Sequence, residues 1–246
     1  MRYEDLCWRG VHAKDLGVIV VEQVCYKRPA LRLETVTVAG RSGTLTISQT
    51  PTWDVVPYTP GLAIRPGADR EAVFDWLQGS GRVIFGSMPD SAFDATITGQ
   101  IDVTEHVPGH PAGYLMLAPT FECQPYRYEV VPAAQMRGSS SLAGYNPRNA
   151  AAAPLISAAV TPGTVLTLRV SGCEDVIVET PEAEGDTLTV ILDCDAQTVY
   201  TDGGVALGSV MLGDFPLIAP GDWTLEATGD NGSVQSVSLL PRWRSL

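Results

Sequence analysis

Positive charge is scarce in this chain of 246 residues. Only 16 residues are Lys or Arg, with Lys14 and Lys27 the only lysines, whereas 28 are Asp or Glu, which gives a formal net charge of −12. A surface of this sign repels the phosphates of nucleic acids and of anionic membranes. The composition therefore argues against a protein that binds DNA, RNA or a membrane surface by its charge.

Long apolar runs and paired cysteines are also missing. No stretch approaches the roughly 20 apolar residues that a membrane-spanning helix needs, and no apolar signal segment follows residues 2–5. No CxxC motif occurs, and no cysteine lies near a histidine at metal-ligand spacing. We therefore expect reduced thiols, no membrane insertion and folding in a cytoplasm. The five cysteines are Cys7, Cys25, Cys123, Cys173 and Cys194.

The motifs of nucleotide binding and of nucleophilic catalysis are absent. The sequence has no GxxxxGK(S/T) loop, no GxGxxG that opens a helix after a strand, and no GxSxG elbow. His106 and His110 have the spacing of two metal ligands on a helix, but Pro108 and Gly109 break any helix there. We expect these histidines to lie in a loop, and we expect no cofactor, no metal and no catalytic residue.

Asp193 and Asp195 are the one pair of carboxylates whose spacing is compatible with a catalytic role. They lie two residues apart at the end of a predicted strand, so both side chains point to the same face. Such a pair can bind calcium or act as acid and base in glycoside hydrolysis. Because no partnering acid or aromatic platform is identifiable, we favour a structural role, in which Asp193 closes a turn and Asp195 is solvated.

The composition is typical of a globular β protein, with 45% hydrophobic residues, 24 glycines and 18 prolines. Residues 18–24 are strand-like. Residues 31–38 alternate with period two, so Leu31 and Leu33, and after a phase slip Val36 and Val38, are expected to face a core. A turn at residues 40–43 then leads into a further strand at 44–48.

One helix is predicted, over residues 69–79. Val73, Trp76 and Leu77 recur at helical spacing and define one buried face. Asp69 is expected to be the N-cap, and Gly79 to supply a left-handed residue at the C-terminal end.

The second half is predicted to consist of strands alone. Before it, residues 135–153 are rich in Ala and Ser without periodicity, and are expected to form a linker or an ordered crossover. Seven short strands without a helix indicate a β-sandwich or a jelly roll. The predicted strands cover residues 165–170, 176–179, 187–192, 198–201, 205–207, 223–227 and 234–239.

Several short motifs, in order over more than 200 residues, resemble those of the distal tail proteins of long-tailed phages. Each consists of a strand or turn with Gly, Pro or an aromatic residue at a fixed place. The motifs lie at residues 16–20, 34–43, 76–83, 120–126, 146–147, 153–156, 192–200, 213–217, 220–225 and 241–244.

The resemblance implies a mainly β chain in two domains. Residues 1–132 would form an N-terminal β-sandwich with one packed α-helix, which builds a ring. Residues 133–153 would be the linker or crossover, and residues 154–246 a C-terminal galectin-like β-sandwich. The structural residues to which we give most weight are Gly40, Arg41, Gly43, Trp76, Leu77, Cys123, Pro125, Tyr126, Phe215, Trp223 and Trp243.

The function implied by the resemblance is structural. Six copies would form a homohexameric ring that joins the tail tube protein to the baseplate or tail tip. The ring would be a hub for a tail-associated fibre or lysin protein and for receptor-binding proteins, and DNA would pass through it without specific binding. Such a protein is assembled in the bacterial host cytoplasm and resides in the virion.

Two other functions stay open at this point. A carbohydrate-binding β-sandwich module or adhesin would show an exposed aromatic patch. A glycoside hydrolase would need two carboxylates roughly 5–9.5 Å apart in a cleft. The tryptophans on predicted strands, Trp53, Trp223 and Trp243, are expected to be core residues, with the arginines beside Trp243 flanking or stacking on its indole.

Overall fold

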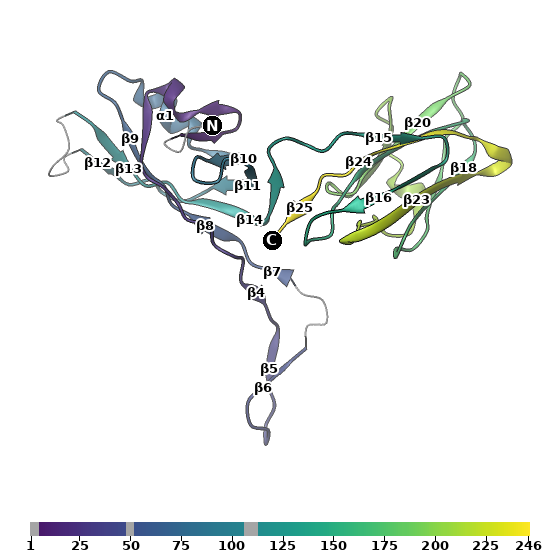
Figure 1. Ribbon diagram of the computed structural model, residues 1–246, viewed down its shortest axis with the longest axis horizontal. Coiled ribbons are helices and arrows are strands. Elements are labelled where there is room, and N and C mark those ends of the chain that lie inside the picture. The colour runs from purple at the N-terminus through teal and green to yellow at the C-terminus, as the bar shows by residue number, and fades with distance from the viewer. Residues whose placement is uncertain (1–4, 48–51, 106–112) are drawn as a thin grey trace. The chain divides into compact units, whose positions relative to one another are not determined.

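The computed structural model describes residues 5–47, 52–105 and 113–246 (Figure 1). They fall into two compact units, which divide between Val130 and Val131. Strands account for 49% of the chain and helices for 7%. The prediction of a mainly β fold with one packed α-helix is therefore confirmed, and no described helix is long and apolar enough to cross a membrane.

The first unit is built on two antiparallel sheets with a shared core. Trp8, Tyr58, Phe85 and Phe121 lie at the centre of this core, in edge-to-face and tilted ring contacts with centroids 5.3–5.7 Å apart. One sheet has the order β2 (Val11–His12), β1 (Leu6–Trp8), β10 (Gly79–Phe85), β11 (Ser91–Ile97), β14 (Phe121–Glu129), with β8 (Val56–Tyr58) also on β14. The other has the order β12 (Val103–Thr104), β13 (Leu115–Leu117), β9 (Gly61–Ile64), β3 (Val18–Glu22).

The predicted helix forms as α1 (Arg70–Trp76). The Asp69 carboxylate caps it by accepting the N–H groups of Glu71 and Ala72 at 3.1 and 3.2 Å. Gly79 has a left-handed φ of 77°, as expected, and is the first residue of β10. Val73 and Trp76 are buried, so α1 packs on the sheets through the face that its periodicity predicts.

Pro125 lies inside β14 at a place where the sheet register breaks. Phe93 on β11 pairs with Arg127, and Ala95 pairs with Cys123, so three residues of β14 face one residue of β11. A bulge of this kind leaves backbone groups outside the ladder, which is where a proline without an N–H can sit in a central strand.

The second unit is a sandwich of two five-stranded antiparallel sheets. The first has the order β15 (Met136–Gly138), β24 (Val234–Leu240), β17 (Leu155–Val160), β20 (Leu188–Asp193), β21 (Thr198–Thr201). The second has the order β16 (Ser141–Asn146), β23 (Gly221–Gly229), β18 (Val165–Val170), β19 (Val176–Glu179), β22 (Met211–Leu212). Buried residues alternate along the strands and meet in one core between the sheets.

Two sequence expectations for this unit differ from the structure in detail. Residues 133–153, expected to form a linker or crossover, contain β15 and β16, which complete the two sheets. Residues 205–207 form no strand and contribute a single bridge between Tyr200 and Ala206. The remaining regular elements are β25 (Arg244–Ser245) and the short 3-10 helices Ala13–Leu16, Gly208–Val210 and Asp230–Gly232.

Candidate functional site

The described residues contain no group of three or more His, Cys, Asp and Glu able to hold a metal ion. His106 and His110 lie outside the described ranges, so the structure does not bear on their predicted loop position. The paired aspartates and the exposed surfaces remain as candidate functional sites.

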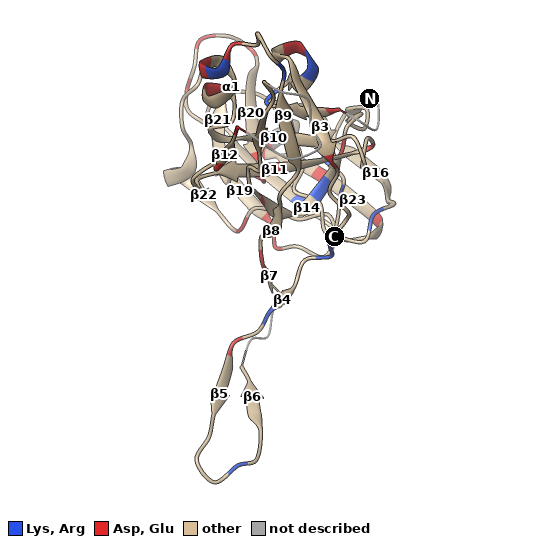
Figure 2. Cartoon of the chain, turned by 90° about the vertical axis from the view of Figure 1, so that its left-hand side faces the viewer, with Lys and Arg blue, Asp and Glu red and all other residues tan. Residues whose placement is uncertain are grey.

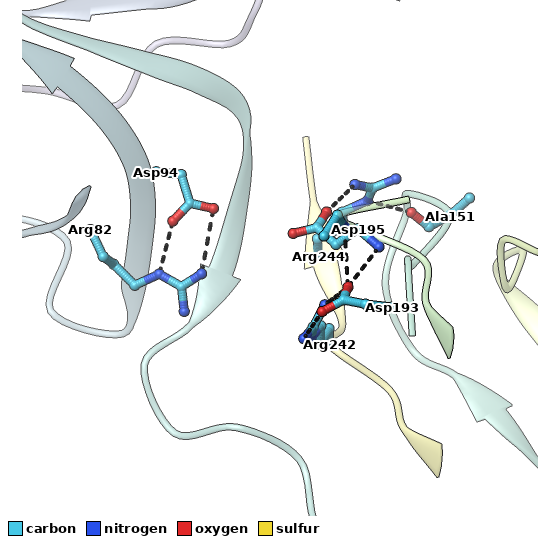
Figure 3. Close-up of polar contacts among 8 residues, drawn as sticks. Arg82, Asp94, Ala151, Asp193, Asp195, Arg242 and Arg244 are labelled. Carbon is cyan, nitrogen blue, oxygen red and sulfur yellow. Dashed lines mark hydrogen bonds and ion pairs between the residues drawn. The ribbon is translucent and has the colours of Figure 1, made fainter. Parts of the chain in front are cut away.

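Asp193 closes a turn, as the structural alternative expects. Its Oδ1 accepts the N–H groups of Asp195 and Ala196, both at 3.1 Å, and its carboxylate binds the guanidinium of Arg242 (Figure 3). Burial alone would raise the pKa of Asp193, but these hydrogen bonds outweigh burial, so the pKa lies below its ordinary value. A general acid in glycoside hydrolysis needs a raised pKa, so Asp193 is unsuited to that role.

The C-terminal segment is held by its arginines. Besides the bond from Arg242 to Asp193, the Arg244 side chain donates to the carbonyl of Ala151 and lies 3.8 Å from Asp195 (Figure 3). Both arginines flank Trp243 in the sequence, and their side chains bind oxygen acceptors. Trp243 instead packs beside Trp223, with ring centroids 6.4 Å apart in the sandwich core.

The other residues predicted to be structural lie in both units. Trp76 donates its indole N–H to the carbonyl of Trp8 at 3.1 Å, and Leu77 is fully buried beside it. Cys123 is buried in β14, and burial raises the pKa of its thiol to about 12. Pro125 and Tyr126 are half-buried in the bulge of β14, and Phe215 packs against the core of the second unit.

The hairpin over residues 31–53, described except for 48–51, carries a surface that the sequence analysis did not identify as functional. We call this hairpin the arm. The arm comprises two ladders, β4 (Leu31–Arg32) with β7 (Thr52–Trp53), and β5 (Thr35–Thr37) with β6 (Thr44–Thr46). Neither ladder pairs with any other strand in the described ranges. Gly40 and Gly43 both have left-handed φ angles, of 81° and 80°, and flank Arg41 in the turn at the tip.

The two faces of the arm differ in chemistry. Val36 on β5 lies opposite Leu45 on β6, and Val38 and Ile47 are in phase with them, so one face is apolar. The opposite face consists of threonines, with Thr35 opposite Thr46 and Thr37 opposite Thr44.

The apolar residues of the arm are exposed, against the expectation that they face a core. Val36, Val38, Leu45 and Ile47 are 37–50% exposed, and Leu31 and Leu33 are 42% and 51% exposed. The alternation correctly predicts strands with one apolar face, but nothing in the described part of this chain covers that face. Exposed apolar faces of this kind are typical of surfaces that contact another molecule.

The arm carries little charge, in contrast to the acidic chain as a whole. Residues 31–53 contain two basic side chains, Arg32 and Arg41, and one acidic side chain, Glu34, whereas the whole chain has a net charge of −12. Figure 2 shows β5 and β6 free of charge along their length, with a basic residue in the turn that joins them. The arm is thus suited to a partner surface that is acidic around an apolar centre.

Comparison with known proteins identifies the fold. No protein-family model matches the sequence, and no curated protein matches it. The distal tail protein (Dit) of phage SPP1, described as a paradigm of the hub adsorption apparatus in phages that infect Gram-positive bacteria, has a similar structure. Its TM-score is 0.66 at 14% identity, over 96% of this chain and 97% of that chain.

A chain of the phage P2 baseplate in its activated conformation is similar as well, in structures with calcium and with strontium. In both, the TM-score is 0.51 at 10% identity, over 94% of this chain and 92% of that chain. Because these similarities extend over nearly the whole chain, we conclude that it shares the fold of a phage distal tail and baseplate protein.

Proposed function

We propose that this chain is a non-enzymatic structural protein of a phage tail, of which six copies form a ring that joins the tail tube to the baseplate or tail tip. The SPP1 and P2 proteins that share its fold are a hub and a baseplate component. In this role the ring binds the tail tube protein on one side and a tail-associated fibre or lysin protein and receptor-binding proteins on the other. The protein assembles in the host cytoplasm and resides in the virion.

The observation that supports self-assembly best is the apolar face of the arm. A two-stranded ribbon alone is at best marginally stable in water. Four exposed aliphatic side chains form one face of the arm. Covering them with a neighbouring molecule stabilises the contact by about 25 cal/mol for each Å² of apolar surface removed from water. The acidic remainder of a second copy of the chain offers the complementary charge, so a second copy is the partner that we propose for the arm.

The first experiment measures the mass of the purified protein by light scattering and images it in negative stain. The proposal expects a mass six times that of the 26.2 kDa chain, and particles with a central hole. A protein that stays monomeric at every concentration would contradict the proposed self-assembly.

Paired variants test the role of the arm. Val36→Glu with Leu45→Lys places an opposite-charge pair on the apolar face, at residues that lie opposite each other. Thr35→Glu with Thr46→Lys places the same pair on the threonine face. Both designs place an opposite-charge pair across the two strands. We expect the first to yield monomers and the second to keep the ring, and equal behaviour of the two would rule out the apolar face as the contact.

A further inference from the structure

The second unit has a hollow on the outer face of the sheet formed by β16, β23 and β18. Its volume is about 520 Å³, and it is a shallow depression that is wide open to solvent. Tyr145, Asp222, Thr224 and Ser171 line it together with the small residue Ala143. None of these residues has a place in the proposed ring function.

The hollow follows from the alternation of side chains on two neighbouring strands. Tyr145 on β16 lies opposite Asp222 on β23, and Ala143 lies opposite Thr224, so all four point outward. The methyl group of Ala143 leaves room beside the tyrosine ring. Tyr145 is 63% exposed, although β16 is an edge strand of the sheet and its aromatic ring could be covered by neighbouring side chains.

The floor of the hollow is fixed by the core beneath it. Gly144 lies opposite Trp223, and a side chain at Gly144 would come within 2.7 Å of the indole ring. Trp223 is buried and packs against Trp243. At the rim, Ser171 Oγ accepts the N–H of Thr224 at 3.1 Å, and Ser171 N–H donates to the Thr224 carbonyl at 3.0 Å. These contacts hold Ser171 in place and leave its hydroxyl proton free to be donated.

The polar side chains that line the hollow carry a carboxylate and hydroxyl groups. Asp222 supplies a carboxylate acceptor next to the exposed ring of Tyr145, and Ser171 and Thr224 supply hydroxyl groups. No hydrogen bond within the described part of the chain involves the Tyr145 hydroxyl or the Asp222 carboxylate. An aromatic face flanked by a carboxylate and hydroxyls matches a ligand with one apolar face and several hydroxyl groups on its edge.

Other ligand classes fit less well. A phosphate or carboxylate ligand is disfavoured by Asp222 and by the acidic chain as a whole. A cation cage needs several aromatic walls, and Tyr145 is the only aromatic side chain that lines the outward face of the hollow. We propose that the hollow binds a neutral hexopyranose unit of a glycan, which stacks on Tyr145 and forms hydrogen bonds to Asp222 and Ser171.

The test is saturation-transfer difference NMR on the full-length protein with methyl glycosides of glucose, galactose, rhamnose and N-acetylglucosamine. We expect transfer to at least one of them at millimolar concentration, as is usual for an open site with a single aromatic residue. Transfer to none of the four would overturn the proposal.

Substitutions of residues that line the hollow test whether any observed sugar binding occurs there. Tyr145→Ala and Asp222→Asn should each weaken binding about tenfold or more, whereas Tyr145→Phe keeps the ring face and should keep most of the affinity. Glu179→Gln, on the outer face of β19 and outside the hollow, is the matched control and should change nothing. A signal that persists unchanged in Tyr145→Ala, in protein with an unaltered melting temperature, would place the binding elsewhere and refute the site.

Whole glycans distinguish the sources of the sugar. An isolated cell-wall polysaccharide and a lipopolysaccharide are compared for binding to the wild-type protein and to Tyr145→Ala. Retention of either glycan by the wild type alone supports the proposal and identifies its source, and equal retention of both by the variant contradicts it. The site does not depend on ring formation, so a protein that fails to form hexamers can still pass or fail this test.

Discussion

Arg242 holds Asp193 by two hydrogen bonds, from Nη1 to Oδ1 at 2.6 Å and from Nη2 to Oδ2 at 3.0 Å (Figure 3). A two-point contact between a guanidinium and a carboxylate is the strongest form of such a pair. The Arg242 backbone has a left-handed φ of 51°, which is unfavourable for a residue with a side chain. The pair thus fixes the end of the chain against β20 in spite of this backbone conformation.

Asp193→Asn should lower the free energy of unfolding by about 1–2 kcal/mol at pH 7, because the substitution keeps the shape and removes the charge. Denaturant unfolding of the two proteins measures the difference. Asp175→Asn is the control, since its partner Arg169 is exposed and the pair is solvated, and this change should leave the unfolding midpoint unaltered.

The effect of Asp193→Asn should depend on pH. The pKa of Asp193 in the folded protein lies below the ordinary value of 3.8, so the carboxylate stabilises the fold fully above pH 3.8. This stabilisation is lost as the pH falls through the lowered pKa, and the difference between the wild type and the variant should shrink there. A difference that is constant from pH 7 to pH 2 would show that the charge of Asp193 is not its source.

Trp76→Phe should destabilise the first unit by about 1–2 kcal/mol, since it removes the hydrogen bond to the Trp8 carbonyl and leaves that buried oxygen without its partner. Phe74→Leu, on the same helix and only half-buried, changes a side chain that makes no hydrogen bond and should cost less. Thermal unfolding of both variants checks the order. Equal losses would mean that the hydrogen bond contributes little.

Gly144→Ala should destabilise the second unit by about 1–3 kcal/mol, because the new methyl group would overlap the indole of Trp223. Gly208→Ala is the control, as a methyl group there meets no atom within 4 Å and the φ angle is not left-handed. The measurement is the denaturant midpoint, with tryptophan fluorescence as the signal. Unchanged stability of Gly144→Ala would mean that the indole can move aside.

The cysteines should differ in reactivity toward iodoacetamide in the native protein. Burial raises the pKa of the Cys123 and Cys194 thiols to about 12, so little of the reactive thiolate forms at pH 8. Cys25 is exposed and should be alkylated first. Peptide mass mapping follows the reaction, and in denaturant all five cysteines should react. Alkylation of Cys123 as fast as that of Cys25 would contradict the buried position.

Elements fixed by neighbouring residues could be predicted from the sequence. The helix follows from the cap at Asp69 and the spacing of Val73 and Trp76, all within one short segment. The turn at Asp193 follows in the same way from its own backbone neighbours. In both cases the interactions that determine the structure lie within about two turns of chain, where a pattern can show them.

Elements that depend on distant partners could not be predicted. Arg242 lies 49 residues from Asp193, and no spacing rule joins them. Strands β15 and β16 complete sheets with β24 and β23, far along the chain. Their own short sequences, MRG and SLAGYN, have few β-branched residues and indicate no strand. For Val36 and Leu45, the alternation predicts an apolar face, but it does not tell whether the same chain or another molecule covers that face.

The way in which the apolar face of the arm is covered decides the symmetry that copies of this chain adopt. Two arms brought together by their apolar faces would form an isologous, twofold contact, which closes with two copies. An arm laid on the acidic surface of a neighbour is a heterologous contact, in which each copy gives one surface and receives a different one. Contacts of that kind add copies in one direction and end only in a closed ring or an open filament.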